Sequence, residues 1–160
     1  MEAEKRQIVK RIVYTAFTAV LIIFIFAQSC LPAKISSEES SRVLEFLNSI
    51  TDLLGLGSIF TSHIVRKLAH FTEFAMLGVF FMLSVSTYKN KYPKQYIMTL
   101  LGCLSVAVCD ECIQLFIPGR AGSIQDVLLD FSGALFGVTV VSVFIYFNKR
   151  TWNKNHRGKI

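Results

Sequence analysis

The sequence predicts an all-α integral membrane protein, a four-transmembrane-helix bundle with one extracytoplasmic amphipathic helix. Of its 160 residues, 52% are hydrophobic and only 18% are charged, and the mean hydropathy is +0.49. A soluble domain of this length would need more polar surface to cover its core. The charges are also grouped, which leaves four apolar stretches near the roughly 20 residues that a helix needs to cross a bilayer. We therefore expect a single membrane domain over residues 1–160, with spans at about 12–28, 68–87, 95–116 and 125–147.

The net charge of +6 comes from basic residues next to the ends of these spans. They are Lys5, Arg6, Lys10 and Arg11, then Lys89, Lys91 and Lys94, then Lys149, Arg150, Lys154, Arg157 and Lys159. Cytoplasmic segments of membrane proteins carry such an excess of Lys and Arg. The pattern predicts a cytoplasmic N-terminus, C-terminus and 88–94 loop, with segments 29–66 and 117–123 outside. Topology and anionic headgroups explain these clusters, so we do not expect nucleic acid as a partner.

The first apolar stretch is expected to be retained as a span. A cleaved signal peptide is the alternative, because the small residues before Cys30 faintly resemble a processing site. A lipoprotein-type site would have Leu where Ala27 stands, which favours retention.

A helix that is too charged to span a membrane is predicted at about residues 38–54. Its apolar residues recur at helical spacing, with polar and charged residues mainly between them. The apolar set is Val43, Leu44, Phe46, Leu47, Ile50, Leu53 and Leu54. Ser36 and Glu39 have capping-box spacing at its start, and Gly55 and Gly57 follow its end. We expect this helix to lie on the outer membrane face or to cap the bundle.

Unusual polar residues gather at the predicted outer ends of the last three spans. They are Arg66, Lys67, His70 and Glu73 on the second span, Asp110, Glu111 and Gln114 on the third, Arg120 in the next loop, and Asp126 and Asp130 on the fourth. Charged residues within membrane-length segments usually face a bundle interior or a wet cavity. With a rise of about 1.5 Å per residue, Glu73, Asp110 and Asp130 lie at a similar depth, about two turns below the outer surface. We therefore expect one outward-facing polar site.

Capping and small residues predict how the last span begins and packs. Ser123 is a good N-cap, and Asp126 follows it at capping-box spacing. Gly133 and Gly137 form a G-x-x-x-G on the face that carries Asp126 and Asp130, and such a motif allows two helices in lipid to approach closely. The face with the two carboxylates is therefore expected to pack against another helix.

The predicted polar site carries a surplus of acids. Five acids (Glu73, Asp110, Glu111, Asp126 and Asp130) accompany three bases (Arg66, Lys67 and Arg120), which leaves two negative charges in excess before His70 is counted. In a low-dielectric site, this excess requires protonated groups or a bound cation. A purely structural interpretation pairs Arg120 with Asp126 or Glu111, and Arg66 with Glu73, to fix the helix register.

Two functional interpretations also remain open. The first is a binding site for a lipid headgroup, a cell-wall precursor or an amphiphilic antibiotic; four spans are few for a transporter unless the chain forms a homo-oligomer. The second is an enzyme that acts on a lipid-linked phosphate at the outer leaflet. Its candidate catalytic residues are His70, Glu73, Asp110, Glu111 and Asp126, its candidate ligands for a divalent cation are His70, Glu73, Asp126 and Asp130, and its candidate phosphate-binding residues are Arg66, Lys67 and Arg120.

Three motifs that contain these residues resemble the VanZ-like family of membrane proteins. They are R-K-L-A-H-F-T-E-F-A-M-L-G at 66–78, D-E-C-I-Q-L-F-I-P-G-R at 110–120 and S-I-Q-D-V-L-L-D-F-S-G-A-L-F-G at 123–137, with a weaker F-A-Q-S at 26–29. The family pattern carries over onto Lys67, His70, Glu73, Asp110, Glu111, Gln114, Arg120, Asp126, Asp130 and Gly133. Asp130 departs mildly, because many relatives are expected to have Asn there.

The resemblance implies a multi-pass protein of the bacterial cytoplasmic membrane. The family's name-giving member is associated with low-level resistance to teicoplanin, an anionic lipoglycopeptide that acts at the outer membrane face. The resemblance therefore implies that the protein modulates the cell envelope or lipoglycopeptide susceptibility. Besides the lipid bilayer, the partners to expect are a lipid headgroup, a cell-wall precursor or a lipoglycopeptide.

Overall fold

The computed structural model describes residues 1–55, 57–88 and 92–157, and these residues form helices without any strand. The helices are α1 (Glu2–Ser29), α2 (Ala33–Leu53), α3 (Ser62–Ser86), α4 (Tyr92–Gln114) and α5 (Ile124–Arg157). Among these described residues, four segments are long and apolar enough to cross a membrane, namely Glu4–Ser29, Ser62–Ser86, Tyr92–Gln114 and Ile124–Asn148. The predicted fold class, an all-α bundle of four membrane-spanning helices, is confirmed.

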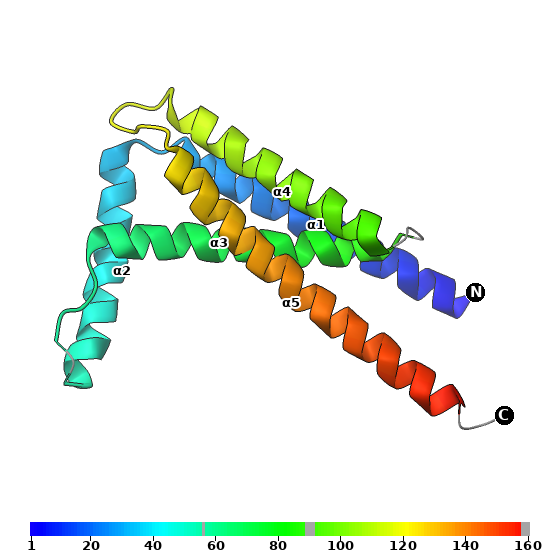
Figure 1. Ribbon diagram of the computed structural model, residues 1–160. Helices are drawn as coiled ribbons and strands as arrows, with labels where there is room; N and C mark the ends of the chain where they lie inside the picture. Colours follow the sequence, from blue (N-terminus) through cyan, green and yellow to red (C-terminus); the bar gives the residue numbers. More distant parts are fainter. Residues whose placement is uncertain (56, 89–91, 158–160) are drawn as a thin grey trace.

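The bundle consists of α1, α3, α4 and α5, and α2 leaves it at one end (Figure 1). α3 and α5 cross at its centre and share the most extensive contact. α1 packs against α3 and α4, and α4 also packs against α3 and α5. The start of α1 and the C-terminal end of α5 lie away from α2, whereas the 115–123 loop lies at the same end as α2 (Figure 1). One end of the bundle therefore carries α2 and the 115–123 loop, and the other end carries neither.

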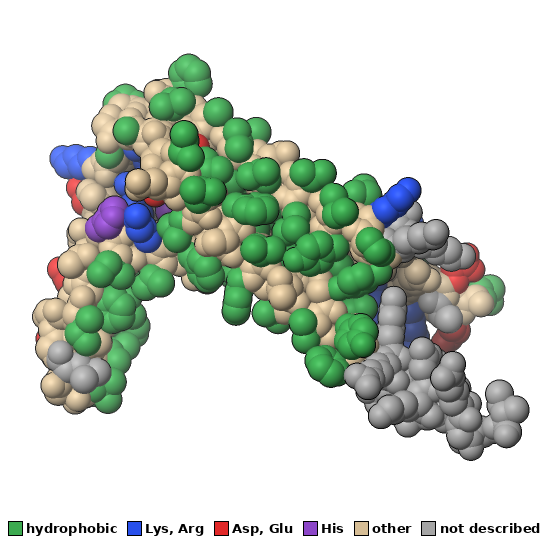
Figure 2. Space-filling view, in the orientation of Figure 1, with side chains coloured by type: hydrophobic (Ala, Val, Ile, Leu, Met, Phe, Trp, Pro, Cys, Tyr) green, Lys and Arg blue, Asp and Glu red, His purple; other side chains and the backbone are tan. Residues whose placement is uncertain are grey.

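Large hydrophobic side chains cover the face of the bundle that Figure 2 shows, and many others on the spanning helices are exposed. Exposed examples on the four spanning helices are Ile23, Met76, Leu101 and Phe136. Fewer hydrophobic residues are buried in the interior, and these include Phe74, Leu77, Cys103, Ala107 and Ala134. An apolar exterior suits lipid, and lipid provides little hydrophobic drive for helices to associate. Close backbone packing must therefore hold the bundle together.

α3 and α5 approach so closely that their contact requires glycine. A Cβ added at Gly133 or Gly137 would overlap the α3 backbone, at Phe71 and Ala75 respectively. The predicted G-x-x-x-G surface thus packs against α3, as helices in lipid do when small residues face each other. This contact also fixes the register of α5 against α3. As a consequence Asp130, one turn earlier on α5, lies against α3.

α2 begins earlier than the capping-box spacing predicts. It starts at Ala33, directly after Pro32 at φ −54° and ψ 147°, rather than near residue 38. Proline cannot continue α1, but its missing N–H is not needed where a helix begins. The Pro32 carbonyl accepts hydrogen bonds from the backbone N–H groups of Ile35 and Ser36, so Ser36 lies inside the helix and does not cap it. The end is as predicted, since Gly55 follows α2 with a φ of +72°.

α2 is amphipathic and packs against α3 near the point where the chain re-enters the bundle. Asn48 fastens the connection, because its side chain both donates to the Phe60 carbonyl and accepts from the Phe60 N–H, at 3.3 and 3.1 Å. Figure 2 shows hydrophobic side chains along one side of α2, and the exposed ones include Val43, Phe46 and Ile50. An exposed apolar face of this kind suits a helix that lies at a membrane surface.

We expect Gly133→Ala to destabilise the bundle, because the added Cβ would push α5 away from the α3 backbone at Phe71. Overpacking of this kind costs about 1–3 kcal/mol. The change is measured as a lower thermal unfolding midpoint of the detergent-solubilised protein. Ser132→Ala, at an exposed position of the same helix, is the control and should leave the midpoint nearly unchanged. Identical midpoints for Gly133→Ala and the wild type would contradict a contact that requires glycine.

Candidate functional site

Buried polar side chains gather inside the bundle at the end that carries α2. They are Ser29 on α1, Asp110, Glu111 and Gln114 on α4, and Asp130 on α5, each at most 6% exposed. Together with His70 on α3, we call them the polar layer. Polar groups are costly to bury unless they are paired, so their partners determine what this layer can do.

Asp110 is held by hydrogen bonds to both of its carboxylate oxygens. The Ser29 hydroxyl donates to Oδ1, and the Gln114 side-chain amide donates to Oδ2 at 2.8 Å. The same amide lies 3.4 Å from the Ser29 Oγ, so the three side chains form one cluster. The cluster joins α1 to α4 and fixes the direction of the Asp110 carboxylate.

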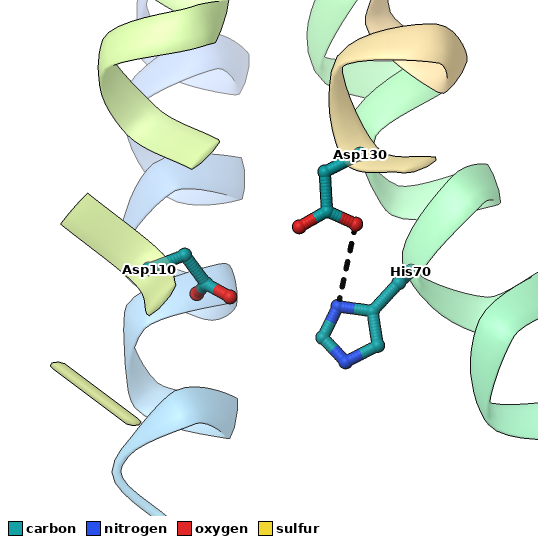
Figure 3. A group of neighbouring side chains, drawn as sticks. All are labelled: His70, Asp110 and Asp130. Atoms are coloured by element: carbon teal, nitrogen blue, oxygen red, sulfur yellow. Dashed lines mark ion pairs between the residues drawn. The ribbon is translucent and has the colours of Figure 1, made fainter. Parts of the chain in front are cut away.

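Asp130 and His70 face each other across the contact between α5 and α3. His70 Nδ1 lies 3.8 Å from Asp130 Oδ1, and the Asp130 side chain is 1% exposed. Figure 3 shows Asp110 on the other side of the same small space, and one ligand atom from each of the three residues lies within 4.8 Å of the other two. An imidazole and two carboxylates, from three different helices, thus converge on one point.

Glu111 caps the N-terminus of α5. Its Oε2 accepts a 2.7 Å hydrogen bond from the backbone N–H of Ser123, and the Ser123 hydroxyl accepts from the N–H of Gln125 at 3.2 Å. Ser123 therefore stands at the cap position, as predicted. The reciprocal bond that the capping-box spacing assigns to Asp126 is made by Glu111 instead, because the end of α4 lies directly beside the start of α5.

Arg120 closes the polar layer from the loop between α4 and α5. Its Nη1 donates to the backbone carbonyl of Ser29 at 3.4 Å, while its Nε is buried without a hydrogen-bond partner. Burial, and then repulsion from the Arg66 guanidinium, lower the pKa of Arg120. Arginine nevertheless stays charged at neutral pH. Two cations near each other form a site that an anion would stabilise.

His70–Asp130 is the one ion pair within 4.0 Å among the described side chains of the polar layer. The pairs that a purely structural interpretation expects are not formed in this part of the chain: Arg66 with Glu73, and Arg120 with Asp126 or Glu111. The reasons are local, because Glu111 caps α5 and Arg120 binds a backbone carbonyl. Arg66 and Arg120 therefore do not form the expected ion pairs with the nearby carboxylates.

A cavity of about 450 Å³, here called the apolar cavity, lies between α2 and α3. Its apolar lining includes Val43 and Leu47 from α2 and Leu68 and Met76 from α3. Its polar lining comprises Gln28, Ser36, Ser40, Arg66, His70, Thr72, Glu73 and Arg120. The cavity thus combines a hydrophobic wall with charged groups, as a site for an amphiphile would.

A second cavity of about 160 Å³, here called the polar cavity, is bordered by residues of α3, α4, α5 and the 115–123 loop. Its charged and polar lining comprises His63, Arg66, Lys67, His70, Glu111, Gln114, Arg120 and Asp126. Arg66, His70 and Arg120 line both cavities. The two cavities therefore share a wall that carries positive charge.

The ten residues proposed from the sequence as binding residues all lie at this end of the bundle. Eight line one or both cavities, namely Arg66, Lys67, His70, Glu73, Glu111, Gln114, Arg120 and Asp126, while Asp110 and Asp130 lie buried beside His70. Their roles in binding, catalysis or metal coordination stay predictions. The grouping differs from the predicted metal ligands, because Asp110 stands beside His70 and Asp130 where Glu73 and Asp126 were expected.

Ser29 is a member of the polar layer that the sequence analysis did not single out. It is fully buried, and it contacts Asp110, Gln114 and Arg120. A signal was present, because Ser29 ends the F-A-Q-S segment in which the family resemblance is weaker. Apart from that segment, nothing in the sequence distinguishes Ser29 from an ordinary polar residue at the end of a membrane span.

Comparison with known proteins supports the resemblance carried by the three motifs. Searches of curated proteins and of solved structures gave no match. The family model described as VanZ/LLP1 matches residues 12–145, which include the polar layer and the lining of both cavities. The match covers most of the chain and all of the site. The chain therefore belongs to the VanZ/LLP1 family.

Proposed function

We propose that this multi-pass membrane protein binds the anionic headgroup of an amphiphile at the outer face of the bacterial cytoplasmic membrane. Through this binding it modulates the cell envelope, including susceptibility to lipoglycopeptides such as teicoplanin. One observation carries the proposal: Arg66, His70 and Arg120 line both the apolar and the polar cavity. A ligand that placed its tail in one cavity and its headgroup in the other would contact all three residues.

The distribution of charge supports an anionic headgroup. Arg66 and Arg120 repel each other, and the described part of the chain gives neither an ion-pair partner within 4.0 Å. Phosphate and carboxylate groups accept two hydrogen bonds at once from a guanidinium, which makes Arg a suitable residue for recognising them. An anion bound here would relieve the repulsion and satisfy the buried Nε of Arg120.

The amphipathic α2 supports an amphiphile rather than a free anion. Val43 and Leu47 of α2 face Leu68 and Met76 of α3 across the apolar cavity. Hydrophobic lining of this kind would bury part of an acyl or prenyl chain, at roughly 0.8 kcal/mol for each buried CH₂ group. A water-soluble phosphate would gain nothing from this wall.

The basic clusters support an outward orientation of the site. Lys5 and Lys10 belong to the first turns of α1 and Lys94 to the first turn of α4, at the end of the bundle where the chain begins (Figure 1). The cavities are lined by residues of α2 and the 115–123 loop, which lie at the opposite end. Lys and Arg are enriched in cytoplasmic segments, so the end with the cavities would face outward.

The convergence of His70, Asp110 and Asp130 beside the polar cavity favours a second function. A metal-dependent hydrolase or transferase would use such residues at a lipid-linked phosphate held by Arg66 and Arg120. Release of phosphate from a polyprenyl diphosphate by the purified protein tests this. Turnover that is lost in Asp130→Asn but kept in Asp52→Asn would favour the enzyme. Absence of turnover in the wild type would contradict the enzyme and leave binding without catalysis as the function.

Single cysteines test the orientation of the site. In a background where Cys30, Cys103, Cys109 and Cys112 are replaced by Ala, we expect Ala121→Cys to react in intact cells with a maleimide that cannot cross membranes. Lys94→Cys, exposed at the other end, should react only after permeabilisation. The reverse pattern would place the cavities in the cytoplasm and contradict the proposed outer site.

Arg66→Gln and Arg120→Gln test the binding of an anionic headgroup. Each variant should raise the Kd for phosphatidylglycerol by about 10–100-fold, because a charge-assisted hydrogen bond contributes about 1.5–3 kcal/mol. Affinity is measured by titrating the full chain in neutral detergent, with phosphatidylcholine of the same acyl chains as the headgroup control.

The matched control is Arg42→Gln, because Arg42 is exposed on α2 and lines neither cavity. If it weakens binding as much as the other two variants, the attraction is a general effect of positive charge. Teicoplanin susceptibility of cells that express each variant then reports whether binding and the cellular effect change together.

A further inference from the structure

Asp130 is a buried carboxylate without a hydrogen-bond partner. Its side chain is 1% exposed, and neither Oδ1 nor Oδ2 is hydrogen-bonded. The facing His70 Nδ1, at 3.8 Å, is likewise buried without a hydrogen bond. A buried carboxylate is strongly unfavourable unless its charge is compensated. The two side chains point toward each other across the space between α5 and α3 (Figure 3).

Asp110 points into the same space from α4 (Figure 3). Ser29 and Gln114 each donate one hydrogen bond to its carboxylate, which fixes its direction. Each carboxylate oxygen can accept two such interactions, so both keep an electron pair for a further partner. Outer hydrogen bonds of this kind are typical of carboxylates that bind metal ions.

The spacing of the three residues is close to that of metal ligands. His70 Nδ1 and Asp130 Oδ1 are 3.8 Å apart, and one ligand atom from each of the three residues lies within 4.8 Å of the other two. Ligands at about 2.1 Å from a tetrahedral ion are separated by about 3.4 Å. Small rotations of the two carboxylates would therefore bring all three residues to bonding distance.

The charge of the group calls for a divalent cation. Asp110 and Asp130 together contribute two negative charges, and neither forms an ion pair with Arg or Lys in the described part of the chain. Protonation of His70 would neutralise only one of these charges. One imidazole nitrogen with carboxylate oxygens suits Zn²⁺ or Mn²⁺, whereas Ca²⁺ and Mg²⁺ prefer oxygen alone.

We propose that His70, Asp110 and Asp130 bind a divalent transition-metal ion, Zn²⁺ or Mn²⁺, at the contact of α3, α4 and α5. Three protein ligands leave a coordination position open for water or for an oxygen of a ligand in the adjoining polar cavity. His70 lines that cavity and its side chain is 20% exposed, which gives the ion a route of entry. The metal site does not depend on whether an amphiphile binds.

The site is tested by metal analysis of the full chain, purified in detergent without a polyhistidine tag. The protein is stripped with EDTA, reloaded with Zn²⁺ or Mn²⁺, and freed of excess ion. Inductively coupled plasma mass spectrometry should then find about one ion per chain. Asp130→Asn and His70→Ala should retain less than a tenth of this amount, whereas Asp52→Asn, an exposed carboxylate on α2, should retain all of it.

A cobalt spectrum of the wild-type protein provides a measurement that needs no variant. Four-coordinate Co²⁺ with nitrogen and oxygen ligands absorbs visible light more strongly than six-coordinate aqueous Co²⁺, and Zn²⁺ should displace it. Absence of both stoichiometric metal and this absorption overturns the proposal. Equal metal content in Asp130→Asn and wild type also overturns it, because the ion would then lie elsewhere. If the wild-type protein binds one metal ion per chain but does not bind phosphatidylglycerol, the result contradicts only the amphiphile proposal.

Discussion

The close contact between the α3 and α5 backbones is the constraint on which the polar layer depends. Gly133 lies directly against the backbone of Phe71, and the residue before Phe71 is His70. Because α5 is a rigid helix, this contact also fixes Asp130, which lies one turn before Gly133. A register shift of one residue would rotate the Asp130 carboxylate by about 100° around the axis of α5 and away from His70. The glycine surface therefore holds the bundle together and also aligns the two side chains.

The hydrogen bonds of the polar layer decide which of its acids remain without a partner. Glu111 is used to cap α5, which also holds the short loop that carries Arg120. Asp110 is tied to Ser29 and Gln114. Within the polar layer, Asp130 is the carboxylate that has no hydrogen bond in the described structure. One acid of the surplus that is visible in the sequence thus lies fully buried without a hydrogen bond.

The spans and the end of the bundle that carries the site could be predicted from the sequence, because hydropathy and helical spacing are local properties. The rotation of one helix against another is not local, and the grouping of the site residues differs from the predicted one for this reason. Glu73 shares a helical face with His70, yet it lines the apolar cavity beneath α2 rather than the space before Asp130. Asp110 was one of several acids that were predicted at a similar depth, and the packing of α4 places it beside His70 and Asp130. Sequence spacing shows which residues share a face, but not which face meets which neighbour.

A purely structural role would make the His70–Asp130 contact a costly way to fix the helix register. Apolar side chains of similar volume pack as well in such a position and avoid the desolvation of a carboxylate. A buried polar group in a membrane bundle is more readily explained when it binds something that the bundle alone does not contain. The surroundings agree, since His70 lies between the space shared with Asp110 and a wall that carries Arg66 and Arg120. An anionic headgroup on that wall would therefore lie next to a cation held by the carboxylates, and each charge would stabilise the other.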